Sequence, residues 1–188
     1  MKKIMFTDDL TRVVLEGRKT MTRRIAFSEE ISKPESGFLT EGDHAGKLVL
    51  CDGGLIVAKS AYKVGEDVAV AQRYSDIPME TLMKQRADGK TGRWPFESLV
   101  KRSKGFRNKM YVAADLMPYR IKITNIRVER LQEITNADCI LEGIGKNSDI
   151  MNYSNPREAF ADLIDKISGR GTWEKNPWVW VYEFELVK

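Results

Sequence analysis

Apolar side chains at helical spacing predict a helix over residues 8–16. Those that recur at i, i+3 and i+4, and so share one face, are Leu10, Val13 and Val14. Thr7 stands where an N-cap is expected, and the two aspartates after it suit the positive end of the helix dipole. Gly17 is a natural stop for this helix. We therefore expect residues 17–25, GRKTMTRRI, to form the turn and extended segment behind it.

Alternating apolar and polar positions predict several strands. Two apolar runs joined by an Asp-Gly-Gly turn predict a hairpin over residues 47–60. A shorter strand is expected at residues 67–72, and a long strand with a bulge or bend at residues 119–131. In residues 178–187 aromatic side chains and one leucine occupy every second position, which is typical of a core strand.

Two further helices are predicted in the second half of the chain. Thr135 is an N-cap with Asp138 three residues later, a variant capping box, and the short helix it begins stops at Gly143. Asn155 caps the second helix, and Pro156 takes its first position. About five or six strands that mostly follow one another directly, with three helices, favour an α+β fold. Its sheet would be mixed or antiparallel, and small enough to close into a barrel.

Residues 75–110 contain no long periodic run, so we expect a basic, loop-rich insertion or flap at about residues 75–115. Its arginines and lysines are interrupted by aromatic side chains: Trp94, Phe96, Phe106 and Tyr111. Basic and aromatic residues interleaved in this way are typical of a nucleic-acid contact surface. A solvated loop is the alternative interpretation.

The composition narrows the classes of protein. With 188 residues, 42% hydrophobic and 31% charged, the chain fits one soluble globular domain, and its net charge of +4 is compatible with an anionic partner. The N-terminus has no long apolar run, and no stretch approaches the roughly 18 apolar residues that span a membrane. Cys51 and Cys139 show no paired spacing, which indicates reduced thiols. These features predict a cytoplasmic protein without a membrane partner.

A single histidine, His44, lies in a glycine-rich loop without a second histidine or a cysteine nearby. A metal site and a Ser-His-Asp triad are therefore not expected, and we expect no cofactor.

Residues Gly17, Lys19, Thr22 and Arg24 form the pattern G-x-K-x-x-T-x-R behind the first helix. The stretch LQEITNADCILEGI at residues 131–144 and the aromatic strand at the C-terminus follow it. In this order the motifs resemble the ASCH domain family, and the chain is most similar to ASCH proteins of phages and prophages. The resemblance covers residues 1–26, 61–72 and 116–188. It implies a β-barrel fold related to the PUA domain, and a single ASCH domain over residues 1–188.

Many family members carry glutamate at the position of Thr22. With a threonine there, the chain is similar to the small bacterial ASCH enzymes that hydrolyse the amide of N4-acetylcytidine. In those enzymes a lysine, a threonine three residues later and a distant glutamate form the catalytic group, which this resemblance carries over to Lys19, Thr22 and Glu142. The region from 27 to 115 is much longer here than in those compact enzymes, which counts against the enzyme interpretation.

The chemistry of these three residues suits amide hydrolysis without a metal. A threonine hydroxyl is a poor nucleophile until a base removes its proton. Lys19 can be that base only if burial and neighbouring cations lower its pKa, and Glu142 can protonate the leaving amine or orient a water. The structural alternatives are a solvated ammonium at the helix end, an ordinary strand threonine and a helix-end carboxylate paired with Lys19 or Arg24.

The candidate binding residues surround this group. They are Gly17, Arg18, Arg23, Arg24, Trp94 and Trp178. Backbone amides near the glycine suit a developing oxyanion, the arginines suit an anionic group, and Trp178 suits stacking on a base, which contributes about 1–3 kcal/mol. Trp178 as a core side chain is the alternative.

Three functions are open from the sequence. The first is a module that binds RNA or a modified nucleobase, with an affinity dominated by phosphate neutralisation. The second is a metal-independent amidohydrolase that removes an acyl group from N4-acetylcytidine or a related nucleoside. The third is a phage structural or morphogenetic protein that acts through a protein partner without chemistry. The oligomeric state is left open.

Overall fold

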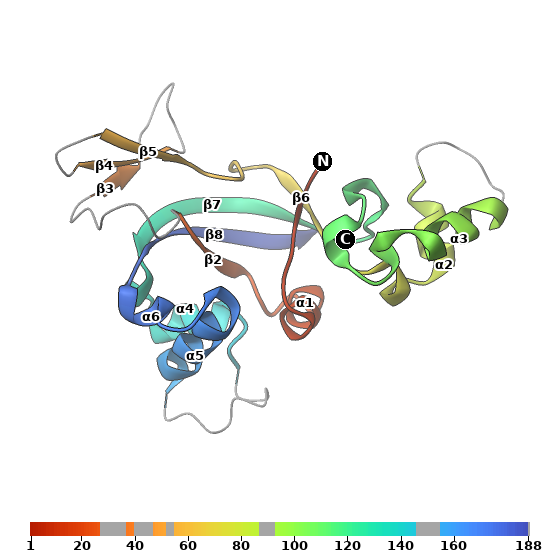
Figure 1. The fold of residues 1–188 in the computed structure, drawn as a ribbon. Helices are drawn as coiled ribbons and strands as arrows, with labels where there is room; N and C mark the ends of the chain where they lie inside the picture. Colours follow the sequence, from red (N-terminus) through yellow and green to blue (C-terminus); the bar gives the residue numbers. More distant parts are fainter. Residues whose placement is uncertain (27–36, 40–46, 52–54, 87–92, 146–154, 188) are drawn as a thin grey trace. The chain divides into compact units, whose positions relative to one another are not determined.

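In the computed structural model the described residues are 1–26, 37–39, 47–51, 55–86, 93–145 and 155–187; for 37–39, 47–51, 55–58 and 93–95 the description is of the backbone alone. They form an α+β fold with two sheets (Figure 1). The five-stranded sheet has the order β1 (Lys2–Ile4), β6 (Asp67–Val70), β7 (Arg120–Arg130), β8 (Trp178–Val187) and β2 (Met21–Ile25). The second sheet consists of β3 (Gly37–Leu39), β4 (Lys47–Cys51) and β5 (Leu55–Lys59).

The larger sheet is mixed and open. β1 pairs parallel to β6, whereas β6 pairs antiparallel to β7 and β2 antiparallel to β8. The edge strands β1 and β2 are not hydrogen-bonded to each other, so the described strands do not close into the barrel that we expected. The α+β class and the mixed sheet are confirmed. Next to β2, the Thr20 amide donates to the Leu141 carbonyl at 2.9 Å.

The chain divides into two compact units. The first contains residues 1–17, 65–122 and 185–188, and the second contains residues 18–64 and 123–184. The division falls directly behind Gly17, within the segment GRKTMTRRI.

In the first unit, the predicted N-terminal helix is confirmed as α1 (Asp8–Leu15), whose N-cap Thr7 accepts a hydrogen bond from the Leu10 amide. The region expected to be loop-rich contains α2 (Met79–Lys84), α3 (Arg93–Arg102) and several 3₁₀ turns. These short elements surround an apolar core; its buried members are Ala69, Ala71, Tyr74, Ile77, Leu82, Val100, Val112 and Met117. A core built from single side chains on short turns leaves no long periodic run in the sequence, which is why the pattern predicted loops.

In the second unit, α4 (Asn136–Leu141), α5 (Pro156–Ser168) and α6 (Thr172–Lys175) lie beside one face of the sheet that contains β2 and β8 (Figure 1). The buried members of the core between helices and strands are Met21, Leu131, Ile134, Cys139, Ile144, Ala159, Phe160, Ile164, Val179 and Val181. Burial of this apolar surface is the main contribution that holds β2 and β8 against the helices.

The helix ends follow the sequence signals. Thr135 and Asp138 form the predicted capping box: the Thr135 hydroxyl accepts from the Asp138 amide at 3.1 Å, and the Asp138 carboxylate accepts from the Thr135 amide at 3.3 Å. Asn155 caps α5: its side-chain oxygen accepts from the Glu158 amide at 3.0 Å. Glu142 is the C-cap of α4, and Gly143 follows it with a φ of 91°, a left-handed conformation that glycine adopts without strain.

β8 is a core strand, as predicted. Its buried side chains come from both faces and include Val179, Trp180, Val181, Tyr182 and Phe184. Among the residues described, no helix combines the length and apolar character that crossing a membrane requires.

Candidate functional site

The segment GRKTMTRRI enters the second unit as a strand. Gly17 ends α1 with a φ of 73°, and β2 then pairs antiparallel with β8, so that Thr22 lies opposite Tyr182 and Arg24 opposite Trp180. Successive side chains on a strand point to opposite faces of the sheet. Thr22 and Arg24 therefore share one face, while Met21 and Arg23 point to the other face, where Met21 joins the core beneath the helices.

Lys19 and Glu142 meet in the interior of the second unit. Lys19 is 2% exposed and Glu142 is 4% exposed. The Lys19 ammonium donates to Oε2 of Glu142 at 2.6 Å and to the Glu142 backbone carbonyl at 2.7 Å. Because Glu142 is the C-cap of α4 and the carbonyl of Leu141, the last residue of α4, accepts from the Thr20 amide, backbone and side-chain contacts together hold the two groups in place. The ammonium and the carboxylate of the predicted group are thus in direct contact.

Burial governs the proton affinity of Lys19. Desolvation lowers the pKa of its ammonium below the usual 10.5, against the attraction of Glu142, and the neighbouring Arg24 and Arg23 lower it further. A lysine with a lowered pKa is closer to the neutral amine that can act as a base.

Thr22 is buried, with 4% exposure, and its backbone lies in the ladder opposite Tyr182. Across the described part of the chain, its hydroxyl forms no hydrogen bond, and so none with Lys19 or Glu142. The structure therefore joins two members of the predicted catalytic group by hydrogen bonds, and the role of Thr22 stays a prediction.

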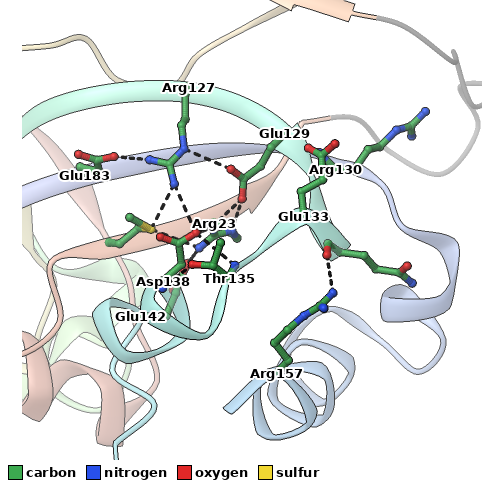
Figure 2. A network of polar contacts seen from close by, with 12 residues as sticks. Arg23, Arg127, Glu129, Arg130, Glu133, Thr135, Asp138, Glu142, Arg157 and Glu183 are labelled. Carbon is green, nitrogen blue, oxygen red and sulfur yellow. Dashed lines mark hydrogen bonds and ion pairs between the residues drawn. The ribbon is translucent and has the colours of Figure 1, made fainter. Parts of the chain in front are cut away.

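Arg23 is surrounded by carboxylates (Figure 2). Its Nη1 donates to Oε1 of Glu142 at 3.2 Å, its Nε to Oε1 of Glu129 at 2.8 Å, and its Nη2 to Oδ2 of Asp138 at 3.0 Å. Nη2 also donates to Oε1 of Glu129 at 2.5 Å. Burial alone would lower the pKa of the guanidinium, but Glu142 and Glu129 outweigh this effect and raise it.

Arg127 extends this network along β7 and β8. It pairs with Glu129 at 3.2 Å, with Asp138 at 3.7 Å and with Glu183 (Figure 2). Among the described residues, the contacts of Lys19, Arg23 and Arg127 therefore join three cations to four carboxylates; the carboxylates are Glu129, Asp138, Glu142 and Glu183. We call these seven residues the charge cluster. Within this cluster Arg23 is paired with three carboxylates of the chain itself, and its predicted role in binding an anionic group stays a prediction.

The other predicted binding residues lie in different surroundings. Arg18 is exposed and Arg24 is half-buried. Trp178 is half-buried, and the Arg130 guanidinium lies over its ring, 4.5 Å from the centroid, so a cation of the chain itself covers part of the predicted stacking surface. The side chain of Trp94 and the whole of His44 lie outside the described residues.

The sequence interpretation missed the aromatic neighbours of Thr22. The Tyr182 hydroxyl is 3.0 Å from the Ser60 hydroxyl and accepts from the Ala61 amide at 3.2 Å. The Tyr62 ring packs edge-on against Tyr182, with 5.1 Å between centroids. Burial raises the pKa of Tyr182. Only the pairing of β2 with β8 brings these rings to the face that carries Thr22, so no local signal identifies them.

Part of the basic stretch at residues 75–115 has contacts within the first unit. Lys109 donates to the Phe6 carbonyl at 2.6 Å and to Asp8 at 2.7 Å. The other contacts of this kind are Arg86 over the Phe96 ring, Lys104 over the Tyr111 ring and the ion pair of Lys101 with Glu97. Several of these cations thus stabilise the fold, and the nucleic-acid surface stays a prediction.

Comparison of this chain with protein-family models, with curated proteins and with solved structures found no match in any of the three.

Proposed function

We propose that this chain is a metal-independent amidohydrolase that removes an acyl group from the exocyclic amine of N4-acetylcytidine or a related nucleoside. One observation carries the proposal: the buried Lys19 ammonium lies 2.6 Å from the Glu142 carboxylate. The ASCH and PUA-like relationship and a cytoplasmic location belong to the same proposal, and both rest on the sequence.

A buried ion pair is weak support for a purely structural role. Removing two charges from water costs several kcal/mol per ion, and well-packed apolar side chains of similar volume are often as stable or more stable. A buried lysine with a lowered pKa and a specific carboxylate partner is instead a recognised mark of a functional site.

The proposed reaction requires that substrate binding bring the Thr22 hydroxyl and the neutral Lys19 amine within hydrogen-bonding distance. The amine then accepts the hydroxyl proton as that oxygen attacks the acyl carbonyl. Glu142 stabilises the ammonium that forms, and this ammonium returns the proton to the leaving nucleoside amine. Water then hydrolyses the acyl-threonine ester, so that one amide and one water yield one amine and one carboxylic acid.

The test is incubation of the protein with N4-acetylcytidine while acetate release and cytidine formation are followed by chromatography. We expect turnover by the wild type and by Lys166→Ala, which changes an exposed lysine of α5. Lys19→Met and Glu142→Gln should lose at least 100-fold in rate, the scale of a missing acid–base group. The absence of turnover at high enzyme concentration, or equal turnover by Lys19→Met, would refute the proposal.

Nucleic-acid binding is the second candidate. It is favoured by the exposed Arg18 beside the site and by the net charge of +4. Titration of labelled RNA at two salt concentrations tests it, because phosphate contacts release counterions and the affinity then falls steeply with salt. An affinity that does not depend on salt, or that is unchanged in Arg18→Ala, would count against this candidate.

A further inference from the structure

The carboxylate of Glu142 is divided between two cations. Its Oε2 accepts from Lys19 at 2.6 Å, and its Oε1 accepts from Nη1 of Arg23 at 3.2 Å. Each oxygen thus has a different partner, and both cations come from the same short segment of the chain. Arg23 was not among the predicted catalytic residues.

Arg23 is itself held from the opposite side. Glu129 on β7 accepts from its Nε and Nη2, and Asp138 on α4 accepts from its Nη2 (Figure 2). The guanidinium is planar and carries its donors in a fixed fork, so contacts at one end set the direction of the other end. Glu129 and Asp138 therefore aim Nη1 of Arg23 at Glu142. Neither of these two carboxylates is an ion-pair partner of Lys19 among the described residues.

We infer that Arg23 is the positioning residue of the site: it binds one oxygen of Glu142 and so leaves a single oxygen for Lys19. This inference deepens the proposed function, and its consequence for catalysis rests on that function. Arg23 acts through Glu142 and touches no reacting atom.

The charges around Lys19 give the direction in which loss of Arg23 changes the pKa of Lys19. Glu142, the C-cap of α4, faces the Lys19 ammonium as the opposite charge, and Arg23 and Arg24 of β2 are the neighbouring like charges. If Arg23 is removed, Lys19 loses a like charge, and the second oxygen of Glu142 becomes available to the ammonium. Both changes favour the protonated form of Lys19, so a smaller fraction of Lys19 would be the neutral amine near neutral pH.

The experiment is an NMR titration of the whole protein labelled with ¹³C-lysine, in which the ¹³Cε shift of Lys19 is followed against pH. The Lys19 signal is assigned by its loss in Lys19→Met. In Arg23→Met we expect the midpoint of the Lys19 titration to increase by about one pH unit or more, the scale of a neighbouring charge. Arg127→Met is the matched control: it removes the other arginine of the charge cluster, which contacts Glu129, Asp138 and Glu183 but forms no ion pair with Glu142. It should leave the midpoint unchanged.

An unchanged midpoint in Arg23→Met, or an equal increase in Arg127→Met, would overturn the inference. If Arg23→Met does not fold, Arg23→Lys replaces it. This variant keeps the charge but has no fork to span Glu129 and Glu142, so a smaller increase is expected, and no increase would overturn the inference.

The titration requires no turnover, which separates the two proposals. If the wild type does not hydrolyse N4-acetylcytidine, the proposed function fails while the titration still decides the role of Arg23. If the wild type does hydrolyse N4-acetylcytidine, the pH midpoint of the rate should move in Arg23→Met in step with the NMR midpoint. A merely structural role of Arg23 would change stability and leave both midpoints in place.

Discussion

Lys19 Nζ and Glu142 Oε2 lie 2.6 Å apart although 123 residues separate them in the chain. The contact joins the segment after α1 to the end of α4, and both side chains are buried. A buried ion pair between distant segments should affect both the stability of the fold and the protonation of Lys19.

The first prediction concerns the stability of this pair. Glu142→Gln leaves the Lys19 ammonium buried without its counter-ion and should lower the free energy of unfolding by about 3–5 kcal/mol. The other single variant is Lys19→Met, and the double variant Lys19→Met with Glu142→Gln removes both charges and should be more stable than Glu142→Gln alone. Urea denaturation of the wild type, both single variants and the double variant measures the coupling. Strictly additive effects would contradict a direct interaction between the two side chains.

The second prediction concerns pH. Burial lowers the pKa of Lys19 in the folded protein below 10.5, so between the lowered value and 10.5 the unfolded chain binds more protons than the folded chain. Stability must then increase with pH across that window. The free energy of unfolding of the wild type, measured relative to that of Lys19→Met, should increase from neutral pH toward 10.5. A constant or falling difference would mean that the folded protein does not lower the pKa of Lys19.

The third prediction tests the N-terminal capping of α4, the helix whose C-cap is Glu142. Thr135→Ala removes the hydroxyl that accepts from the Asp138 amide and should cost about 1 kcal/mol of stability. Thr135→Ser keeps the hydroxyl and should remain within a few tenths of a kcal/mol of the wild type. Thermal unfolding of the three proteins provides the comparison, and equal losses in both variants would show that the hydroxyl does not stabilise the helix.

The fourth prediction concerns the thiol of α4. Burial raises the pKa of Cys139 to about 11, and the thiol is free. Because the thiolate is the reactive form, alkylation of Cys139 in the native protein should be slower than in the unfolded protein by on the order of 100-fold. Mass spectrometry of the peptide that contains Cys139, with a sample in denaturant as the control, measures both rates. Similar rates would place the thiol in contact with solvent.

The local elements of this fold could be predicted because their signals are local. Thr7, Thr135 and Asn155 cap helices through hydrogen bonds to residues three positions later, and such contacts depend on neighbouring sequence alone. The alternating pattern of β8 likewise predicted a core strand. The short helices between residues 75 and 115 escaped prediction because a core contributed by distant side chains holds them in place.

The residues of the candidate site could likewise be predicted only in part from the sequence. The resemblance of the sequence motif placed Lys19 and Glu142 in one catalytic group, and the structural alternative expected them as a helix-end ion pair. The structure shows the contact that both interpretations share. That Arg23 reaches Glu142 from the helix side while Thr22 lies on the opposite face follows from the register of β2 against β8. A shift of one residue in that register would exchange the faces of both side chains. By itself, the sequence determined the helix ends, the strand pattern and the choice of charged groups. The tertiary structure alone decided which of these groups meet, because strand register and the burial of charge depend on contacts between segments far apart in the chain.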